Sequence, residues 1–341
     1  MYARIKNWLS IFPILMLGVF WLAPPLSGQE RADIYVNLGH SYYEIGKYEK
    51  AAEKFQKALE LDPDYPQLHD FLGSALLQSG RIDEAIKAYE RQIVLAPTVA
   101  QCHYNLGLAY LRKDLLEKAI ERFERAVELD GRLVEAHRAL GSTYMEQGNL
   151  SEAISAFKKA IFLDPSSWED YYNLGLAFYR QKKFEEAAQS YQRALGLNPE
   201  GTDIHVALGK TYLELKKVDL ALRRYRNALR INPQDIQVRF KVAEILASLN
   251  RYDESIEQYK VILETAPQNA EVLNNLGTIY FKKKSYEEAR QYFLKAVEIA
   301  PDVDYIHNNL GVLYAEMGMH EKAREEFEKA IAASERKASS P

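Results

Sequence analysis

A spacing of 34 residues runs through almost the whole chain and constrains its fold more than any other feature. A glycine returns at this interval eight times, with Ala243 filling the one gap: Gly39, Gly73, Gly107, Gly141, Gly175, Gly209, Gly277 and Gly311. Sixteen residues after each of these nine places stands an aromatic ring: Phe55, Tyr89, Phe123, Phe157, Tyr191, Tyr225, Tyr259, Phe293 and Phe327. Such a period is typical of repeat proteins, in which each unit stacks on its neighbours.

Each copy carries two helical patterns. With the glycine as position 8, apolar or bulky residues recur at positions 4, 7, 8 and 11, which is the spacing of an amphipathic helix, named helix A here. A second pattern at positions 20, 24, 27 and 28 predicts helix B, and proline at position 32, as in Pro63, ends that helix. Small residues at positions 8 and 20 let the two helices approach, and the ring at position 24 fills the remaining space. Helices of about 12 to 14 residues are marginal alone in water, so stability must come from stacking.

These residues resemble the tetratricopeptide repeat (TPR) family, whose pattern of a bulky residue, Leu-Gly, Tyr, Ala, aromatic, Ala and Pro is met in nearly every copy. The resemblance covers residues 32 to about 335. It implies an all-α fold, a right-handed α-solenoid superhelix of tandem helix-turn-helix repeats, continuous and with eighteen helices and no strand. Nine repeats are expected, followed by a tail at 338–341: 32–65, 66–99, 100–133, 134–167, 168–201, 202–235, 236–269, 270–303 and 304–337. Gly131 in place of proline, in repeat three, is one of a few mild departures.

Composition and motifs point away from catalysis and from nucleic acid. The net charge is -4 and the sequence pI is about 6.1, so the positive field of nucleic-acid-binding proteins is missing. Cys102 is the single cysteine, which excludes a disulfide framework, and its place among apolar residues indicates a small core side chain. No phosphate-binding, metalloprotease or hydrolase motif occurs. We therefore expect a non-enzyme without a cofactor, a metal or a small-molecule substrate.

Two groups of charged residues need a separate interpretation. Histidine occupies position 4 in five repeats: His69, His103, His137, His205 and His307. A metal ladder is one reading, but no cysteine or carboxylate recurs beside them, so we favour packing between helices. Lysines gather in the turns between helices A and B of three repeats, at Lys182 and Lys183, Lys216 and Lys217, and 282–284. A solvated edge is the favoured reading, and an anionic partner or a membrane surface is the alternative.

The first residues have the layout of a secretory signal. Arg4 and Lys6 precede an apolar run from Trp8 to Ala23, and Pro24 and Pro25 follow. The run is shorter than the roughly 20 residues that a membrane helix needs, so a cleaved signal peptide over residues 1–28 is favoured over a retained N-terminal membrane anchor through residues 8–23, and a misread start is the third reading. Either of the first two readings places the repeats outside the cytoplasm. They would be periplasmic or secreted, or anchored to the inner membrane.

The face of helix A that is opposite the core pattern is the candidate binding surface. Positions 5, 6 and 12 belong to it, and in the TPR family this face lines the concave groove. Position 6 is asparagine in five repeats: Asn37, Asn105, Asn173, Asn275 and Asn309. Rings occupy position 5 or 12 in several repeats: Tyr43, Tyr104, Tyr172, Tyr179, Phe240 and Phe281. Amides can pair with a peptide backbone and rings supply contact area, whereas the alternative is scattered polar surface. Because these side chains lie outside the core pattern, their replacement is expected to leave stability nearly unchanged.

The leading functional hypothesis is a non-enzymatic scaffold or adaptor of the cell envelope that binds a protein partner or an extended peptide in the groove. Similar arrays recruit substrates for enzymes, so a substrate-recruiting subunit of an envelope enzyme complex, such as a glycosyltransferase, is the alternative. A structural spacer fixed to the membrane is a third class.

Overall fold

The structure is a computed structural model that describes residues 26–339. The apolar segment from Trp8 to Ala23 lies outside the described residues, so its cleavage or retention stays a prediction. No helix within residues 26–339 is long and apolar enough to cross a membrane.

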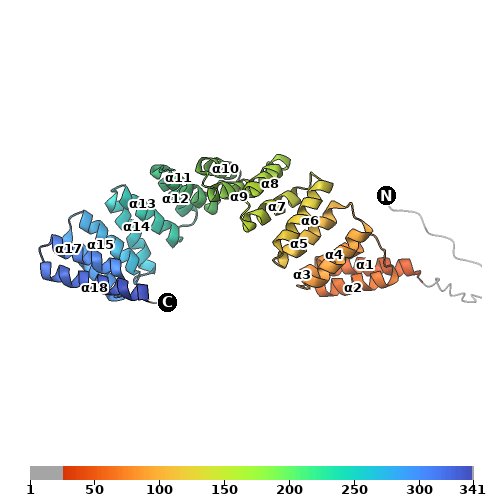
Figure 1. Cartoon of the computed structure of the whole chain (residues 1–341), viewed down its shortest axis with the longest axis horizontal. Coiled ribbons are helices and arrows are strands. Elements are labelled where there is room, and N and C mark those ends of the chain that lie inside the picture. The colour runs from red at the N-terminus through yellow and green to blue at the C-terminus, as the bar shows by residue number, and fades with distance from the viewer. Residues whose placement is uncertain (1–25, 340–341) are drawn as a thin grey trace, which may run out of the picture. The chain divides into compact units, whose positions relative to one another are not determined.

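Residues 26–339 form eighteen α-helices and no strand, in consecutive antiparallel pairs (Figure 1). This confirms the predicted all-α solenoid of helical hairpins. The first six helices are α1 (Gly28–Glu44), α2 (Tyr48–Leu61), α3 (Leu68–Gln78), α4 (Ile82–Leu95), α5 (Ala100–Arg112) and α6 (Leu116–Leu129). The next six are α7 (Val134–Gln147), α8 (Leu150–Leu163), α9 (Trp168–Arg180), α10 (Phe184–Leu197), α11 (Thr202–Glu214) and α12 (Val218–Ile231). The last six are α13 (Ile236–Ser248), α14 (Tyr252–Thr265), α15 (Ala270–Lys282), α16 (Tyr286–Ile299), α17 (Asp304–Glu316) and α18 (His320–Ser339).

The chain divides into two compact units, which the unbroken 34-residue period does not predict. The boundary falls between Leu129 and Asp130, so α1–α6 form an N-terminal unit and α7–α18 form a C-terminal unit. Gly131 stands next to this boundary, at the place where most other repeats have a proline. Proline fixes its own backbone angle, whereas glycine is permissive, so this linker is the least constrained by its sequence.

The core of each hairpin is the predicted contact between position 8 and the ring at position 24. The ring is at most 2% exposed in the first eight repeats. A methyl group added to Gly107 would lie 2.5 Å from the ring of Phe123, so a side chain at this residue would have to displace the ring. In the last repeat Phe327 is half-buried and Ile331 on α18 is exposed. The last described hairpin therefore has a more exposed position 24 ring than the other repeats.

The turn between helices A and B has a left-handed residue at position 15. Glycine fills it in four repeats, and in five repeats the residue is not glycine: Asp114, Lys182, Lys216, Asn250 and Lys284. Lys182 and Lys284 have φ of 60° and Lys216 has φ of 56°. Lysine in this region strains the backbone through its Cβ atom. Three of the turn lysines therefore occupy a position that glycine would fill with less strain.

We expect Lys182→Gly, Lys216→Gly and Lys284→Gly each to raise the free energy of unfolding by about 0.5 to 1 kcal/mol, the relief of strain minus the added entropy of glycine. Lys217→Gly is the matched control, because Lys217 has φ of -92° and is the residue before α12. Urea unfolding of the four variants measures the difference. A gain at Lys217 equal to that at Lys216 would contradict the strain argument.

The histidines at position 4 hold the linkers between repeats. In each of the five, Nε2 donates to the carbonyl oxygen six residues before it, at 2.8 to 3.2 Å. Arg239 makes the same bond to the carbonyl of Pro233 at 2.6 Å. No group of three metal-ligating side chains occurs within residues 26–339. The packing interpretation was therefore incomplete, since these histidines are also hydrogen-bond donors to the linker backbone.

This arrangement predicts destabilisation in mild acid. Burial lowers the pKa of His69, His137 and His205 below the ordinary value of 6.5. Because the folded pKa lies below the unfolded one, the neutral form is favoured by folding, and stability is complete above pH 6.5 and falls as the pH drops below it. The variant His137→Arg with His205→Arg keeps the linker bond with a permanent charge, as Arg239 does. Melting curves at pH 7.5 and 5.5 should show a smaller loss in this variant than in the wild type; an equal loss would contradict the assignment.

Candidate functional site

Two hollows open on one face of the C-terminal unit. Consecutive A helices contact each other there, as α9 and α11 do, and the surface that they share is called the A-helix face here. The first hollow has a volume of about 260 Å³ and lies between α9 and α11. It is lined by Tyr172, Leu176, Tyr179, Tyr191, Asp203, Val206, Ala207 and Lys210. The second has a volume of about 250 Å³ and lies between α13 and α15. It is lined by Glu244, Ala247, Ser248, Tyr259, Asn275, Thr278, Ile279 and Lys282.

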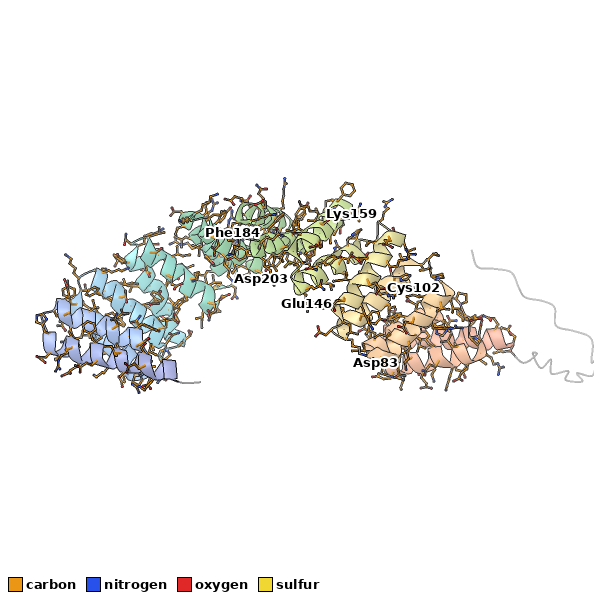
Figure 2. The ribbon with its side chains drawn as sticks, viewed as in Figure 1. Asp83, Cys102, Glu146, Lys159, Phe184 and Asp203 are labelled. Carbon is orange, nitrogen blue, oxygen red and sulfur yellow. The ribbon has the colours of Figure 1, made fainter. Side chains whose placement is uncertain are left out.

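The two hollows are built on the same plan. Each is bounded by two consecutive A helices, and the position 24 tyrosine of the earlier repeat, Tyr191 or Tyr259, contributes to its lining. Each also has one carboxylate and one lysine in its lining, which are Asp203 and Lys210 in the first hollow; Asp203 is labelled in Figure 2. Burial raises the pKa of Tyr191 and Tyr259 well above the ordinary value, so both hydroxyls keep their protons at neutral pH. An apolar wall with a few polar groups suits a peptide side chain and its backbone.

The predicted aromatic residues are not free rings. At position 5, Tyr104, Tyr172 and Phe240 pack on the position 24 ring of their own repeats, with centroids 5.5 to 5.7 Å apart. At position 12, Tyr43, Tyr179 and Phe281 pack on the ring five residues later, at 5.1 to 5.8 Å. All six are half-buried. The premise that these side chains lie outside the core is therefore wrong, because positions 5 and 12 lie at the flank of the core, and we now expect their replacement to lower stability.

Three of the predicted asparagines already have partners in the array. In the N-terminal unit, Asn105 donates to both carboxylate oxygens of Asp70 at 2.9 Å. In the C-terminal unit, Asn309 donates to the side-chain oxygen of Asn274 at 2.9 Å, and Asn275 donates to the hydroxyl of Tyr259 at 3.2 Å. These bonds link consecutive repeats, so the amides help to fix the spacing of the array.

The other two asparagines differ in exposure. Asn37 is exposed, and Asn173 is half-buried beside Tyr172 on α9. Tyr104 and Asn105 belong to the N-terminal unit, whereas Tyr172 and Asn173 belong to the C-terminal unit. Of the predicted residues, Tyr172 and Tyr179 line the first hollow and Asn275 lines the second.

Several lining residues were missed by sequence reasoning. Val206, Ala207 and Lys210 stand at positions 5, 6 and 9 of repeat six. This repeat has no asparagine at position 6 and no ring at position 5 or 12, which were the features used to predict the binding surface. Position 24 is tyrosine rather than phenylalanine in repeats two, five, six and seven, and two of these tyrosines, Tyr191 and Tyr259, line the hollows. Tyr191, Tyr225 and Tyr259 were assigned to the core for their rings alone.

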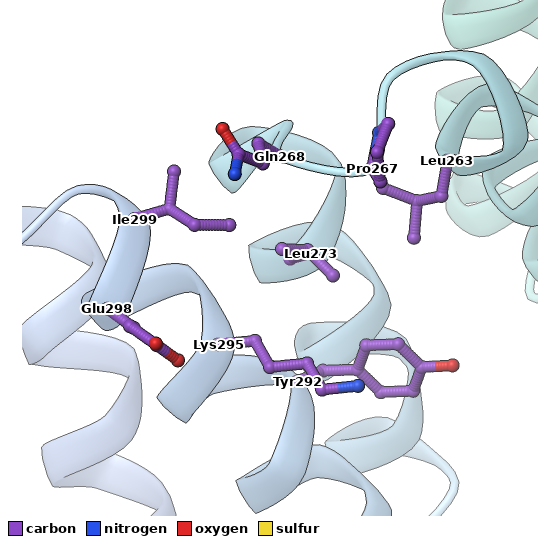
Figure 3. A pocket seen from close by; sticks show the side chains of 8 residues that line it. All are labelled: Leu263, Pro267, Gln268, Leu273, Tyr292, Lys295, Glu298 and Ile299. Atoms are coloured by element: carbon purple, nitrogen blue, oxygen red, sulfur yellow. The ribbon is translucent and has the colours of Figure 1, made fainter.

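A third and larger hollow, about 610 Å³, is formed by α14, α15 and α16 (Figure 3). Leu263, Pro267, Leu273 and Tyr292 contribute to its lining. Leu273 stands at position 4, where six other repeats have the histidine or arginine that binds the linker carbonyl. None of the predicted binding residues lines this hollow.

The paired helices and their hollowed A-helix face define a helical-repeat protein of the α-solenoid class. A family model described as the cilia and flagella-associated protein 70 C-terminal domain, a TPR model, matches residues 65–275. Two tetratricopeptide repeat models match residues 32–65 and 268–336. The chain belongs to the tetratricopeptide repeat family. No curated protein matches the chain in sequence.

Solved structures that resemble about half of the chain include YrrB and MamA. YrrB, described as a TPR protein with an unusual peptide-binding site, is 20% identical with a TM-score of 0.50, over 55% of this chain and 96% of its own. MamA is 28% identical with a TM-score of 0.47, over 51% of this chain and 95% of its own. A MamA from Desulfovibrio magneticus RS-1 is 20% identical with a TM-score of 0.47, over 51% and 97%. The likeness to YrrB shows the fold alone.

Proposed function

We propose that this protein is a non-enzymatic scaffold that binds an extended peptide segment of a protein partner on the A-helix face of its C-terminal unit. The observation that carries the proposal is the pair of hollows between consecutive A helices, each with an apolar wall, a tyrosine hydroxyl and one charge of each sign. An extended segment that lies across the A helices can place side chains in both hollows. The peptide-binding site for which YrrB is described supports the same use of this fold.

The test fills the first hollow without removing a core ring. Ala207 lines this hollow at position 6 of repeat six, and Ala139 is the same residue at the same position of repeat four but lines neither hollow. Peptides are selected from a random display library on the full chain, and their affinities are measured by fluorescence anisotropy. Ala207→Arg should weaken binding at least about tenfold, which corresponds to the loss of one interface anchor. Ala139→Arg should have no effect.

Two results would contradict the proposal. One is that no peptide is selected above background. The other is that the selected peptides bind Ala207→Arg and Ala139→Arg as tightly as they bind the wild type. Both alanines are half-buried on helix A, so arginine at either place is expected to disturb the packing to a similar extent. Melting curves of both variants check that the fold is kept.

We further propose that the scaffold acts outside the cytoplasm, in the cell envelope. The support is the order of Arg4 and Lys6 before the apolar run from Trp8 to Ala23. A reporter protein that functions only outside the cytoplasm is expected to be active when it is fused after Pro341. Activity of a cytoplasm-specific reporter at the same place would overturn this localisation. The mass of the mature chain then distinguishes a cleaved signal from a retained anchor.

A further inference from the structure

The first hollow, between α9 and α11, has a carboxylate without a partner. Asp203 stands in the first turn of α11 and its side chain is exposed. Within residues 26–339 it forms no hydrogen bond and no ion pair. The carboxylate of the second hollow differs, because Glu244 pairs with Lys241 at 2.5 Å. The first hollow therefore has a negative charge that the array itself does not use.

Tyrosine rings lie beside this carboxylate. Tyr172, Tyr179 and Tyr191 line the same hollow. The ring centroids of Tyr172 and Tyr191 are 5.5 Å apart, and the two planes are tilted by 54°. Burial raises the pKa of Tyr172, and the charge of Asp203 adds to this shift, so the carboxylate lies near the Tyr172 hydroxyl. Aromatic rings and an unpaired carboxylate therefore border one space of about 260 Å³.

This combination of groups suits a cation. The face of an aromatic ring carries partial negative charge and attracts a positive group, as a carboxylate does. The guanidinium of arginine is planar, so it can stack on a ring while it donates two parallel hydrogen bonds to a carboxylate. An acidic side chain would be repelled by both the ring faces and Asp203. Arginine is therefore the peptide side chain that matches both features of the hollow.

Three other charged groups near the hollow differ from Asp203. Lys210 also lines the hollow, but it stands seven residues later on α11, about 10 Å further along the helix axis. Its long, flexible side chain can turn its ammonium to water. Arg180 donates to a backbone carbonyl of the preceding repeat at 3.1 Å, and Glu214 accepts from the Tyr179 hydroxyl at 3.4 Å. Asp203 is therefore the short, unpaired charge that is available to a ligand.

We propose, on the basis of the proposed peptide-binding function, that the first hollow binds an arginine side chain of the partner segment. The guanidinium lies against the tyrosine rings and donates to the carboxylate of Asp203. The aliphatic part of the arginine contacts Leu176 and Val206, which form the apolar part of the lining. The second hollow has no such selectivity, because its carboxylate is already paired.

The experiment uses the full chain and the peptides selected on it from the random display library. We expect the selected peptides to contain arginine. Each arginine of the tightest peptide is exchanged in turn for citrulline, which keeps the shape of the side chain and removes its charge. One exchange should weaken binding to the wild type by about 3- to 10-fold, between the effects of an exposed ion pair and of a hydrogen bond to a charged group. The same exchange should have little effect on binding to Asp203→Asn, because the carboxylate is already absent.

Two further variants separate a local contact from a general effect of charge. Glu135→Gln is the matched control, because Glu135 is an exposed carboxylate in the first turn of α7, at the same repeat position as Asp203, and lines neither hollow. Both changes remove a negative charge from the N-terminus of a helix A, so their effects on melting should be equal. Glu135→Gln should leave affinity unchanged. Lys210→Met should tighten binding of the arginine peptide, since it removes a like charge from the hollow.

Selected peptides without arginine would overturn the arginine assignment, as would a citrulline exchange that costs the wild type and Asp203→Asn equally. Tighter binding to Asp203→Asn together with weaker binding to Lys210→Met would show an acidic occupant and would overturn it too. In each of these cases peptide binding itself stands if Ala207→Arg blocks the selected peptides. Selection of no peptide above background would instead contradict the proposed function, and the arginine assignment with it.

Discussion

Replacing Arg138 with alanine is expected to lower the free energy of unfolding of the C-terminal unit by about 2 to 4 kcal/mol, because the change leaves a buried carboxylate without its partner. Asp170 is 1% exposed on α9. The Nε atom of Arg138 donates to both of its oxygens, at 3.0 and 2.8 Å, and Nη2 donates to Asp164 at 2.7 Å. We place the loss below the range for fully buried pairs, since one third of the Arg138 side chain is exposed.

The matched variant removes both charges together. Asp170 stands at position 3, which is apolar or small in the eight other repeats: Ile34, Leu68, Cys102, Ala136, Ile204, Val238, Val272 and Ile306. Replacing a buried ion pair by apolar residues is often neutral or stabilising. Arg138→Ala combined with Asp170→Leu should therefore recover most of the lost stability. Urea unfolding of the single and double variants measures the coupling, and losses that simply add would show that Arg138 acts through packing rather than through Asp170.

The Arg138–Asp170 pair is a contact between repeats that the sequence did not predict. The charge at position 3 of repeat five was visible as a break in an apolar column. Such a break indicates either a functional group or a buried partner. The partner lies 32 residues earlier, at position 5 of the preceding repeat, and only the contact between consecutive A helices brings the two together. A pattern read within single repeats cannot show a contact between repeats.

The helices could be predicted because the same residues fix them nine times. A small residue at position 8, glycine in eight repeats and Ala243 in the ninth, lies against the ring at position 24, so their recurrence specifies the hairpin. The two compact units could not be predicted, because the period continues through Gly131 without a change in length. Of the side chains predicted to bind a partner, Tyr172, Tyr179 and Asn275 line the hollows, and their use in binding stays a prediction.

The sequence could not predict which hydrogen bonds and ring contacts the side chains on the A-helix face make. A periodic pattern assigns a side chain to a face but not to a partner, so Asn105 was predicted to bind a guest although it bonds to Asp70. Rings at positions 5 and 12 looked exposed because helix periodicity ignores the neighbouring helix, whose own rings half-bury them.

The other large effect is expected at Gly175. A Cβ atom at this residue would lie 2.8 Å from two ring atoms of Tyr191, which is itself fully buried. Neither the ring nor the backbone of α9 can move without separating the two helices of repeat five. Gly175→Leu should therefore lower the free energy of unfolding by about 1 to 3 kcal/mol or more through overpacking.

A glycine one helix further on supplies the control for this prediction. Nothing lies within 4 Å of a Cβ atom added to Gly196, which is exposed near the end of α10. Gly196→Ala should leave stability unchanged or raise it by about 0.5 kcal/mol, since alanine is the better helix former. Gly175→Ala tests the approach with the smallest side chain, and it should lose stability although the same change at Gly196 does not. Thermal unfolding of the three variants decides the point. If Gly175→Ala melts like Gly196→Ala, the close contact between position 8 and the ring at position 24 is not what requires glycine in the repeats.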